Sequence, residues 1–122
     1  MENETRLDSL DLMTKAEELL REASDSPAER TKKAIPSPDG LQLFLLYVRA
    51  GALVPKHQVK GPITVQTLLG HAQMTADEHS YDLPQGNIAM FKASVPHDVL
   101  ALTNSVLLVT HAQPLRNEHQ TA

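Results

Sequence analysis

Histidine supplies most of the chemistry that this sequence can perform. The chain has 122 residues, including six histidines and no cysteine. The lack of cysteine excludes disulfides, iron–sulfur clusters, thiolate zinc sites and a cysteine nucleophile. A neutral imidazole can bind a divalent metal or exchange a proton near neutral pH, because its ordinary pKa is about 6.5. The central question is therefore which of the histidines the fold brings together.

Several other kinds of site are missing from the sequence. The five glycines are scattered through turns, so there is no phosphate-binding glycine loop, and no G-x-S-x-G or H-E-x-x-H motif occurs. Acids and bases balance over residues 41–111, which leaves no basic face, and we predict no nucleic-acid or membrane partner. The beginning, MENETRLD, has no apolar segment, so we expect no secretory signal. With the absence of cysteine, this favours a cytoplasmic location.

One segment has the periodicity of a helix. In residues 6–24, RLDSLDLMTKAEELLREAS, apolar side chains recur at spacings of about three residues, and most residue types favour helix. We expect Asp8 or Ser9 to accept hydrogen bonds from the first-turn amides, and Asp11 to lie in the first turn. The helix should end before Pro27 and should pack on its own barrel or on a dimer partner.

From residue 41 the pattern changes to short strands separated by turns. The segment 25–40 is predicted to be a connector, with a short edge strand around residues 32–35 as a weaker alternative. Seven or so strands at intervals of roughly 8–12 residues indicate an antiparallel sandwich or barrel, because βαβ units would place helices between them. The tail, residues 113–122, is polar. The sequence therefore predicts an N-terminal helix and connector over 1–40, a barrel over 41–112, and a C-terminal tail.

Two groups of residues resemble the motifs of the cupin family. The first motif places a glycine, two histidines, a glutamate and a second glycine at fixed intervals. Its positions are filled here by Gly51, His57, Val59, Ile63 or Thr64, and Gly70. The second motif contains a glycine, a Pro-x-Gly turn, a histidine and an asparagine. Its positions are filled here by Gly86, Lys92, Ser94, His97 and Ala101. The resemblance covers residues 40–112 and implies an all-β jelly-roll barrel, also called a double-stranded β-helix.

The resemblance implies that His57 and His97 face each other inside the barrel. Full-motif cupins hold a divalent metal with three histidines and a glutamate, and half of these ligands are missing here. Two alternatives stay open: His57 and His97 bind zinc, nickel, iron or manganese together with water, Gln66 or His111, or they are polar residues hydrogen-bonded within the cavity. Asp98 should point to the face opposite His97, which argues against a dioxygenase triad.

The inward face of the strand at residues 62–69 is ambiguous in the sequence. If Thr64 occupies the glutamate position, Gln66 points inward and joins His57 and His97 as a ligand-binding residue. If Ile63 occupies that position, the inward row is Ile63, Val65, Thr67 and Leu69, and this second choice is slightly favoured. Lys92 either pairs with an anionic ligand near the mouth of the barrel or is simply solvated. Surface positions are expected for His71, His79 and His119, and a half-buried wall position for His111.

The sequence supports three classes of function and leaves open whether the protein is an enzyme. The first is a cupin barrel that binds a small molecule in its interior, with or without a divalent metal. The alternative is a metal-dependent enzyme of the isomerase or lyase type that uses His57 and His97. The third is an interaction module whose helix binds a partner. In each case we expect a homodimer, because the barrel alone offers limited surface to cover the apolar helix.

Overall fold

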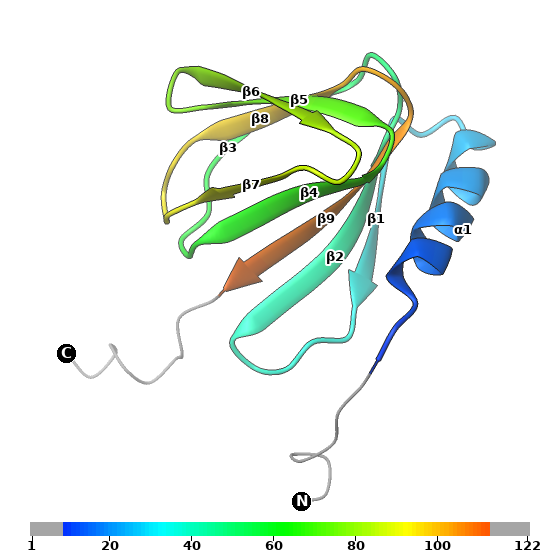
Figure 1. Cartoon of the computed structure of the whole chain (residues 1–122), viewed down its shortest axis with the longest axis horizontal. Coiled ribbons are helices and arrows are strands. Elements are labelled where there is room, and N and C mark those ends of the chain that lie inside the picture. The colour runs from blue at the N-terminus through cyan, green and yellow to red at the C-terminus, as the bar shows by residue number, and fades with distance from the viewer. Residues whose placement is uncertain (1–8, 113–122) are drawn as a thin grey trace, which may run out of the picture.

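The structure is a computed structural model that describes residues 9–112, which fold into one helix and nine strands. These elements are α1 (Leu12–Ser24), β1 (Arg30–Ile35), β2 (Leu41–Val48), β3 (Leu53–His57), β4 (Ile63–Leu69), β5 (His71–Ala76), β6 (His79–Pro84), β7 (Ile88–Phe91), β8 (His97–Ala101) and β9 (Ser105–Ala112). The strands form a five-stranded sheet in the order β1-β2-β9-β4-β7 and a four-stranded sheet in the order β3-β8-β5-β6. The two sheets face each other and α1 lies outside them (Figure 1).

The chain passes repeatedly from one sheet to the other. β3 and β4 are consecutive in sequence but lie in different sheets, and so do β7 and β8, and β8 and β9. All strand pairs are antiparallel. Antiparallel strands that alternate between two packed sheets are the pattern of a jelly roll, so the expected all-β barrel with one N-terminal helix is confirmed.

The helix begins later than the sequence pattern indicates. Asp11 is the N-cap residue, and its carboxylate accepts hydrogen bonds from the backbone N–H and the hydroxyl of Thr14, at 3.1 and 2.8 Å. Ser9 is not helical, so the prediction that it caps the helix is wrong, and Asp8 lies outside the described residues. The cap ends the helix because its backbone is extended. Within residues 9–112 no helix is long and apolar enough to cross a membrane.

The connector contributes a full strand to the larger sheet. β1 pairs with β2 along its whole length, from Arg30 opposite Val48 to Ile35 opposite Leu43. This strand is longer than the short edge strand considered from the sequence, and it lies inside the predicted segment 1–40. The guanidinium of Arg49 also binds this segment, since it donates to the backbone oxygens of Ser26 and Ala28. The sheet therefore begins at residue 30.

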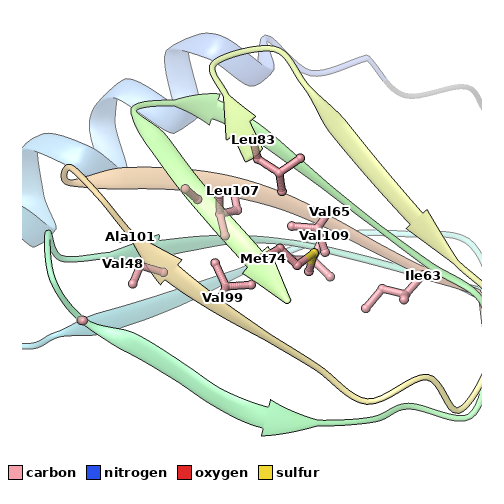
Figure 2. Close-up of a cluster of buried hydrophobic side chains, with 11 residues drawn as sticks. Val48, Ile63, Val65, Met74, Leu83, Val99, Ala101, Leu107 and Val109 are labelled. Carbon is pink, nitrogen blue, oxygen red and sulfur yellow. The ribbon is translucent and has the colours of Figure 1, made fainter. Parts of the chain in front are cut away.

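One hydrophobic core lies between the two sheets. Buried side chains from both sheets meet there, among them Val65, Met74, Val99 and Leu107 (Figure 2). A second core lies between α1 and the outer face of the five-stranded sheet. Its buried members are Ala16, Leu19, Ala23, Leu45, Tyr47, Leu68 and Val106. The apolar stripe of the helix thus packs on the protein's own sheet.

The favoured prediction of which β4 side chains point inward is confirmed for most of the strand. Ile63 and Val65 are buried in the core between the sheets, and Thr67 is buried and donates from its hydroxyl to the backbone oxygen of Leu83 at 2.9 Å. Leu69 does not continue this row and packs in the helix-side core. The register of β4 against β9 shifts between Thr67 and Leu69, which explains the change of face because a bulge adds one residue to the strand.

Candidate functional site

The core between the sheets contains a cavity of about 390 Å³. Nine of its 14 lining residues are aliphatic or aromatic, and the other five are histidine, lysine or glutamine. The lining residues are Lys32, Gln42, Phe44, Leu46, Val54, His57, Val59, Ile63, Val65, His97, Val99, Leu107, Val109 and His111. Such a mostly apolar cavity with a few polar groups is typical of a site for a small organic molecule.

The structure brings His57 and His97 together. They are direct partners across the β3–β8 pair, although 40 residues separate them in the sequence (97 − 57), and their ring centroids lie 4.3 Å apart. His97 is 2% exposed, whereas His57 is exposed to solvent. The centroid of the Phe91 ring lies 5.3 Å from that of the His97 ring. The pair therefore consists of an inner imidazole and an outer one.

Backbone oxygens determine which nitrogen of each imidazole carries the hydrogen. Nδ1 of His57 lies 2.9 Å from the oxygen of Pro55, and Nδ1 of His97 lies 3.0 Å from the oxygen of Val95. A carbonyl oxygen only accepts hydrogen bonds, so both Nδ1 atoms donate. When neutral, each ring consequently has an unprotonated Nε2, which can accept a hydrogen bond from a ligand or bind a metal.

His97 is held in its neutral form. Burial is the main effect, and it keeps the pKa of the His97 imidazole below its usual value of 6.5. The bond to the Val95 oxygen opposes this effect, the neighbouring His57 lowers the pKa further, and Asp98 raises it slightly. Asp98 does not line the cavity, as alternation along β8 predicted. At neutral pH the inner imidazole is therefore an uncharged acceptor.

Three further polar residues line the cavity from the five-stranded sheet: Lys32, Gln42 and His111. His111 is the half-buried wall histidine that the sequence predicted, and its Nε2 accepts a hydrogen bond from the backbone N–H of Gly61 at 3.3 Å. Lys32 lies on β1, with its Nζ 4.2 Å from the centroid of the Phe44 ring. The sequence analysis did not identify Lys32, because residues 25–40 were expected to be mainly connector. The one feature of the sequence that could have identified Lys32 is the segment TKKAI, if it is interpreted as a strand whose side chains alternate between two faces.

Gln66 and Lys92 lie elsewhere. Gln66 does not line the cavity, and its side-chain amide donates to the backbone oxygen of Gly86 at 3.1 Å. Its expected role as a ligand-binding residue does not agree with this placement, because Ile63 and Val65 fill the inward face of β4. Lys92 does not line the cavity either and borders a separate surface hollow beside Thr64 and Met90. Lys92 is exposed, which agrees with the alternative that it is simply solvated.

The remaining histidines are peripheral. His79 is exposed, with its Nδ1 2.9 Å from the oxygen of Asp77. His71 pairs with Asp82 on the outside of the four-stranded sheet, where its Nε2 lies 2.6 Å from Oδ1. Neither lines the cavity. His119 lies outside the described residues.

The donors around the cavity do not fit a complete protein-held metal site. In the described part of the chain, no three His, Cys, Asp or Glu side chains gather as ligands. His57 and His97 supply two imidazoles, whereas zinc sites generally use three or four protein ligands. His111 does not complete the set, because its Nε2 already accepts from Gly61. Any metal here would need ligands from water or from a bound molecule.

Comparison with known proteins identifies the fold. No protein-family model matches the sequence, and no curated protein is significantly similar to it. Among solved structures, an RmlC-like cupin protein from Desulfovibrio desulfuricans matches with a TM-score of 0.69 and 20% identity, covering 90% of this chain and 100% of that one. KdgF from Halomonas sp. matches with a TM-score of 0.65 and 16% identity, covering 75% of this chain and 84% of that one.

A larger enzyme contains a similar domain. Salicylate 1,2-dioxygenase from Pseudoaminobacter salicylatoxidans, in a variant form, matches with a TM-score of 0.66 and 20% identity. The match covers 79% of this chain but 31% of that one. Likeness at such identities establishes a shared fold and leaves the activity undetermined. The chain is accordingly a small jelly-roll protein with the RmlC-like cupin fold.

Proposed function

We propose that this protein binds a small, mostly apolar organic molecule in the cavity between its sheets, with His57 and His97 as polar anchors. The main support is the imidazole pair itself. The rings lie 4.3 Å apart on the wall of a largely aliphatic cavity, and both have Nε2 available as an acceptor. The buried imidazole of His97 is costly without a partner for its Nε2, and a ligand hydroxyl or amide N–H would provide one.

A fluorescence titration with 2-naphthamide tests this proposal. The probe is neutral, apolar and able to donate hydrogen bonds, and the chain contains no tryptophan to interfere with its emission. We expect one probe to bind per chain. The variants His97→Phe and His57→Phe should each weaken binding about fivefold, which corresponds to the loss of one neutral hydrogen bond.

His79→Phe provides the matched control. His79 has the same Nδ1 contact with a backbone oxygen two residues earlier, but it lies on the surface away from the cavity. This variant should bind 2-naphthamide as the natural protein does. Absence of binding to the natural protein, or equal weakening in all three variants, would overturn the proposal.

One observation favours the alternative of a metal-dependent isomerase or lyase. Both imidazoles donate from Nδ1 to a backbone oxygen, and metal-bound histidines usually have such an orienting bond. The incomplete donor set argues against it, so we derive no reaction step through a metal. Metal analysis of protein purified without an affinity tag separates the two functions. Stoichiometric metal that is lost in both His57→Phe and His97→Phe would favour the enzyme.

The homodimer and the cytoplasmic location stay predictions. The helix covers only part of the outer face of the five-stranded sheet, and apolar side chains beside it remain exposed: Ile88 at 45%, Met90 at 70% and Leu41 at 37%. These residues, rather than the helix, are the surface that a second copy would cover. Light scattering at micromolar concentration should give a dimer mass, and Met90→Lys should shift it toward the monomer. A monomeric natural protein would refute the dimer.

A further inference from the structure

We infer that the molecule bound in the cavity carries an anionic group, such as a carboxylate, and that Lys32 recognises this group. The inference rests on the proposed function, because it names the class of molecule that the same cavity takes. Lys32 lies on the edge strand β1, outside the two motif segments that contain His57 and His97. It would add a specificity-determining residue from the opposite sheet.

The strand register places Lys32 on the cavity side of β1. Lys32 is the partner of Leu46 on β2, and Leu46 lines the cavity. Direct partners in an antiparallel pair have their side chains on the same face of the sheet. The adjacent Lys33 is the partner of Leu45, which is completely buried in the helix-side core. The two neighbouring lysines therefore point to opposite faces of the sheet.

A contact with Phe44 holds the Lys32 ammonium beside the cavity. Its Nζ lies 4.2 Å from the centroid of the Phe44 ring, within the range of a cation–π interaction. Phe44 itself lines the cavity. The ring attracts the cation without neutralising it, so the positive charge stays available to a ligand.

Among the described residues, the cavity lining contains one positive charge and no acid to compensate it. Lys32 is the only lysine or arginine among these lining residues, and none of them is an aspartate or a glutamate. Over residues 9–112, Lys32 has no ion pair with an acid. Lys32 is itself exposed to solvent, so a ligand anion would supply the missing partner in a partly exposed ion pair.

The distribution of polar groups suggests how such a ligand lies. Lys32 and His111 come from the five-stranded sheet, whereas His57 and His97 come from the four-stranded sheet. Apolar side chains of both sheets fill the space between them, and the cavity of about 390 Å³ has room for an aromatic or medium-length aliphatic body. A monocarboxylic acid whose body also carries a hydroxyl or amide N–H toward His57 and His97 matches this arrangement.

The lysine also has a purely structural explanation. An inward-pointing charge on an edge strand hinders the addition of a foreign strand, and β1 is an edge of its sheet. That role predicts more aggregation after Lys32 is replaced, but no selective effect on anionic ligands. A comparison of charged and neutral probes separates the two roles.

The test uses 6-hydroxy-2-naphthoate and 6-hydroxy-2-naphthamide, which share one apolar body and one hydroxyl donor for the histidines and differ in charge. The natural protein should bind the carboxylate about fivefold more tightly than the amide, the upper range for a partly exposed ion pair. In Lys32→Met this preference should disappear, because the affinity for the carboxylate falls to that for the amide. Lys33→Met removes the same charge from the other face of the same strand, so it should retain the preference. Lys32→Arg should retain it as well.

Each result has a definite meaning. If neither probe binds, the proposed function itself fails. If the amide probe binds but the carboxylate has no advantage, or keeps it in Lys32→Met, the inference about the anion is overturned while the binding function stands. Equal loss of carboxylate preference in Lys33→Met would also overturn it, because net charge rather than the cavity lysine would then be responsible. Thermal unfolding of each variant verifies that it is folded.

Discussion

The two faces of β2 form two very different interiors. On one face, Leu45 and Tyr47 are fully buried beneath α1, in a core built from apolar side chains. On the other face, Phe44 and Leu46 are only partly buried and border a cavity that also contains histidines and a lysine. Adjacent residues of one strand thus belong to a filled core and to an open one.

Because of this contrast, the two interiors contribute differently to stability and to ligand binding. A filled core gains dispersion and hydrophobic energy from every side chain, whereas a cavity lacks those contacts and lowers stability. The space between the sheets also contains polar atoms that need a partner. The helix-side core therefore stabilises the fold, and the cavity side is available for a ligand.

The largest expected effect is a change in the free energy of unfolding that distinguishes the two faces of β2 directly. Leu45→Ala should lower the free energy of unfolding by about 3 kcal/mol, because it removes a fully buried side chain from a filled core. Leu46→Ala, one residue further along β2, should lower it by about 1 kcal/mol, since its side chain borders space that is already empty. Urea unfolding followed by circular dichroism measures both. Equal losses would show that the two interiors are packed alike.

A smaller effect is expected at the one flaw we find in the filled core. The hydroxyl of Tyr47 is buried and has no hydrogen-bond partner in the described part of the chain. Tyr47→Phe should raise the free energy of unfolding by about 1 kcal/mol, because an unpaired buried hydroxyl is removed and the ring remains. Tyr81→Phe, at an exposed position, is the control and should have no effect. A loss of stability in Tyr47→Phe would reveal a partner for the hydroxyl.

The loop before β8 should contain backbone strain that a substitution can relieve. Ser94 precedes β8 and has a positive φ of 67°, at the position where the resemblance to the cupin motif places glycine. Ser94→Gly should raise the free energy of unfolding by about 1 kcal/mol, because glycine adopts this conformation without steric cost. Ser94→Ala should give no such gain. Chemical denaturation tests the pair, and equal effects of the two substitutions would argue against strain.

The smallest effect is a dependence of stability on pH. Burial lowers the pKa of His97 in the folded state below its usual value of 6.5, so in the window between the two values the unfolded state binds more protons. Stability should consequently be constant above that window and fall as the pH decreases through it. His97→Gln should reduce this fall, whereas His79→Gln, which alters an exposed histidine, should not. The same pH profile in both variants would contradict a buried neutral His97.

The sequence supported much of the fold and part of the site. Alternation and turn residues predicted β2 and the inward row Ile63, Val65 and Thr67, and the motif resemblance predicted the pairing of His57 with His97. The bulge that turns Leu69 toward the helix could not be predicted from the sequence, because it depends on the register of β4 against β9.

The amino-acid sequence alone determined the features that depend on near neighbours. The helix stripe, the strand alternation and the turns each follow from residues only a few positions apart. Only the tertiary structure decided that Lys32 shares a cavity with His57 and His97 and that Gln66 does not. These outcomes depend on which distant strands pair and in which register, and a shift of one residue moves every side chain to the opposite face.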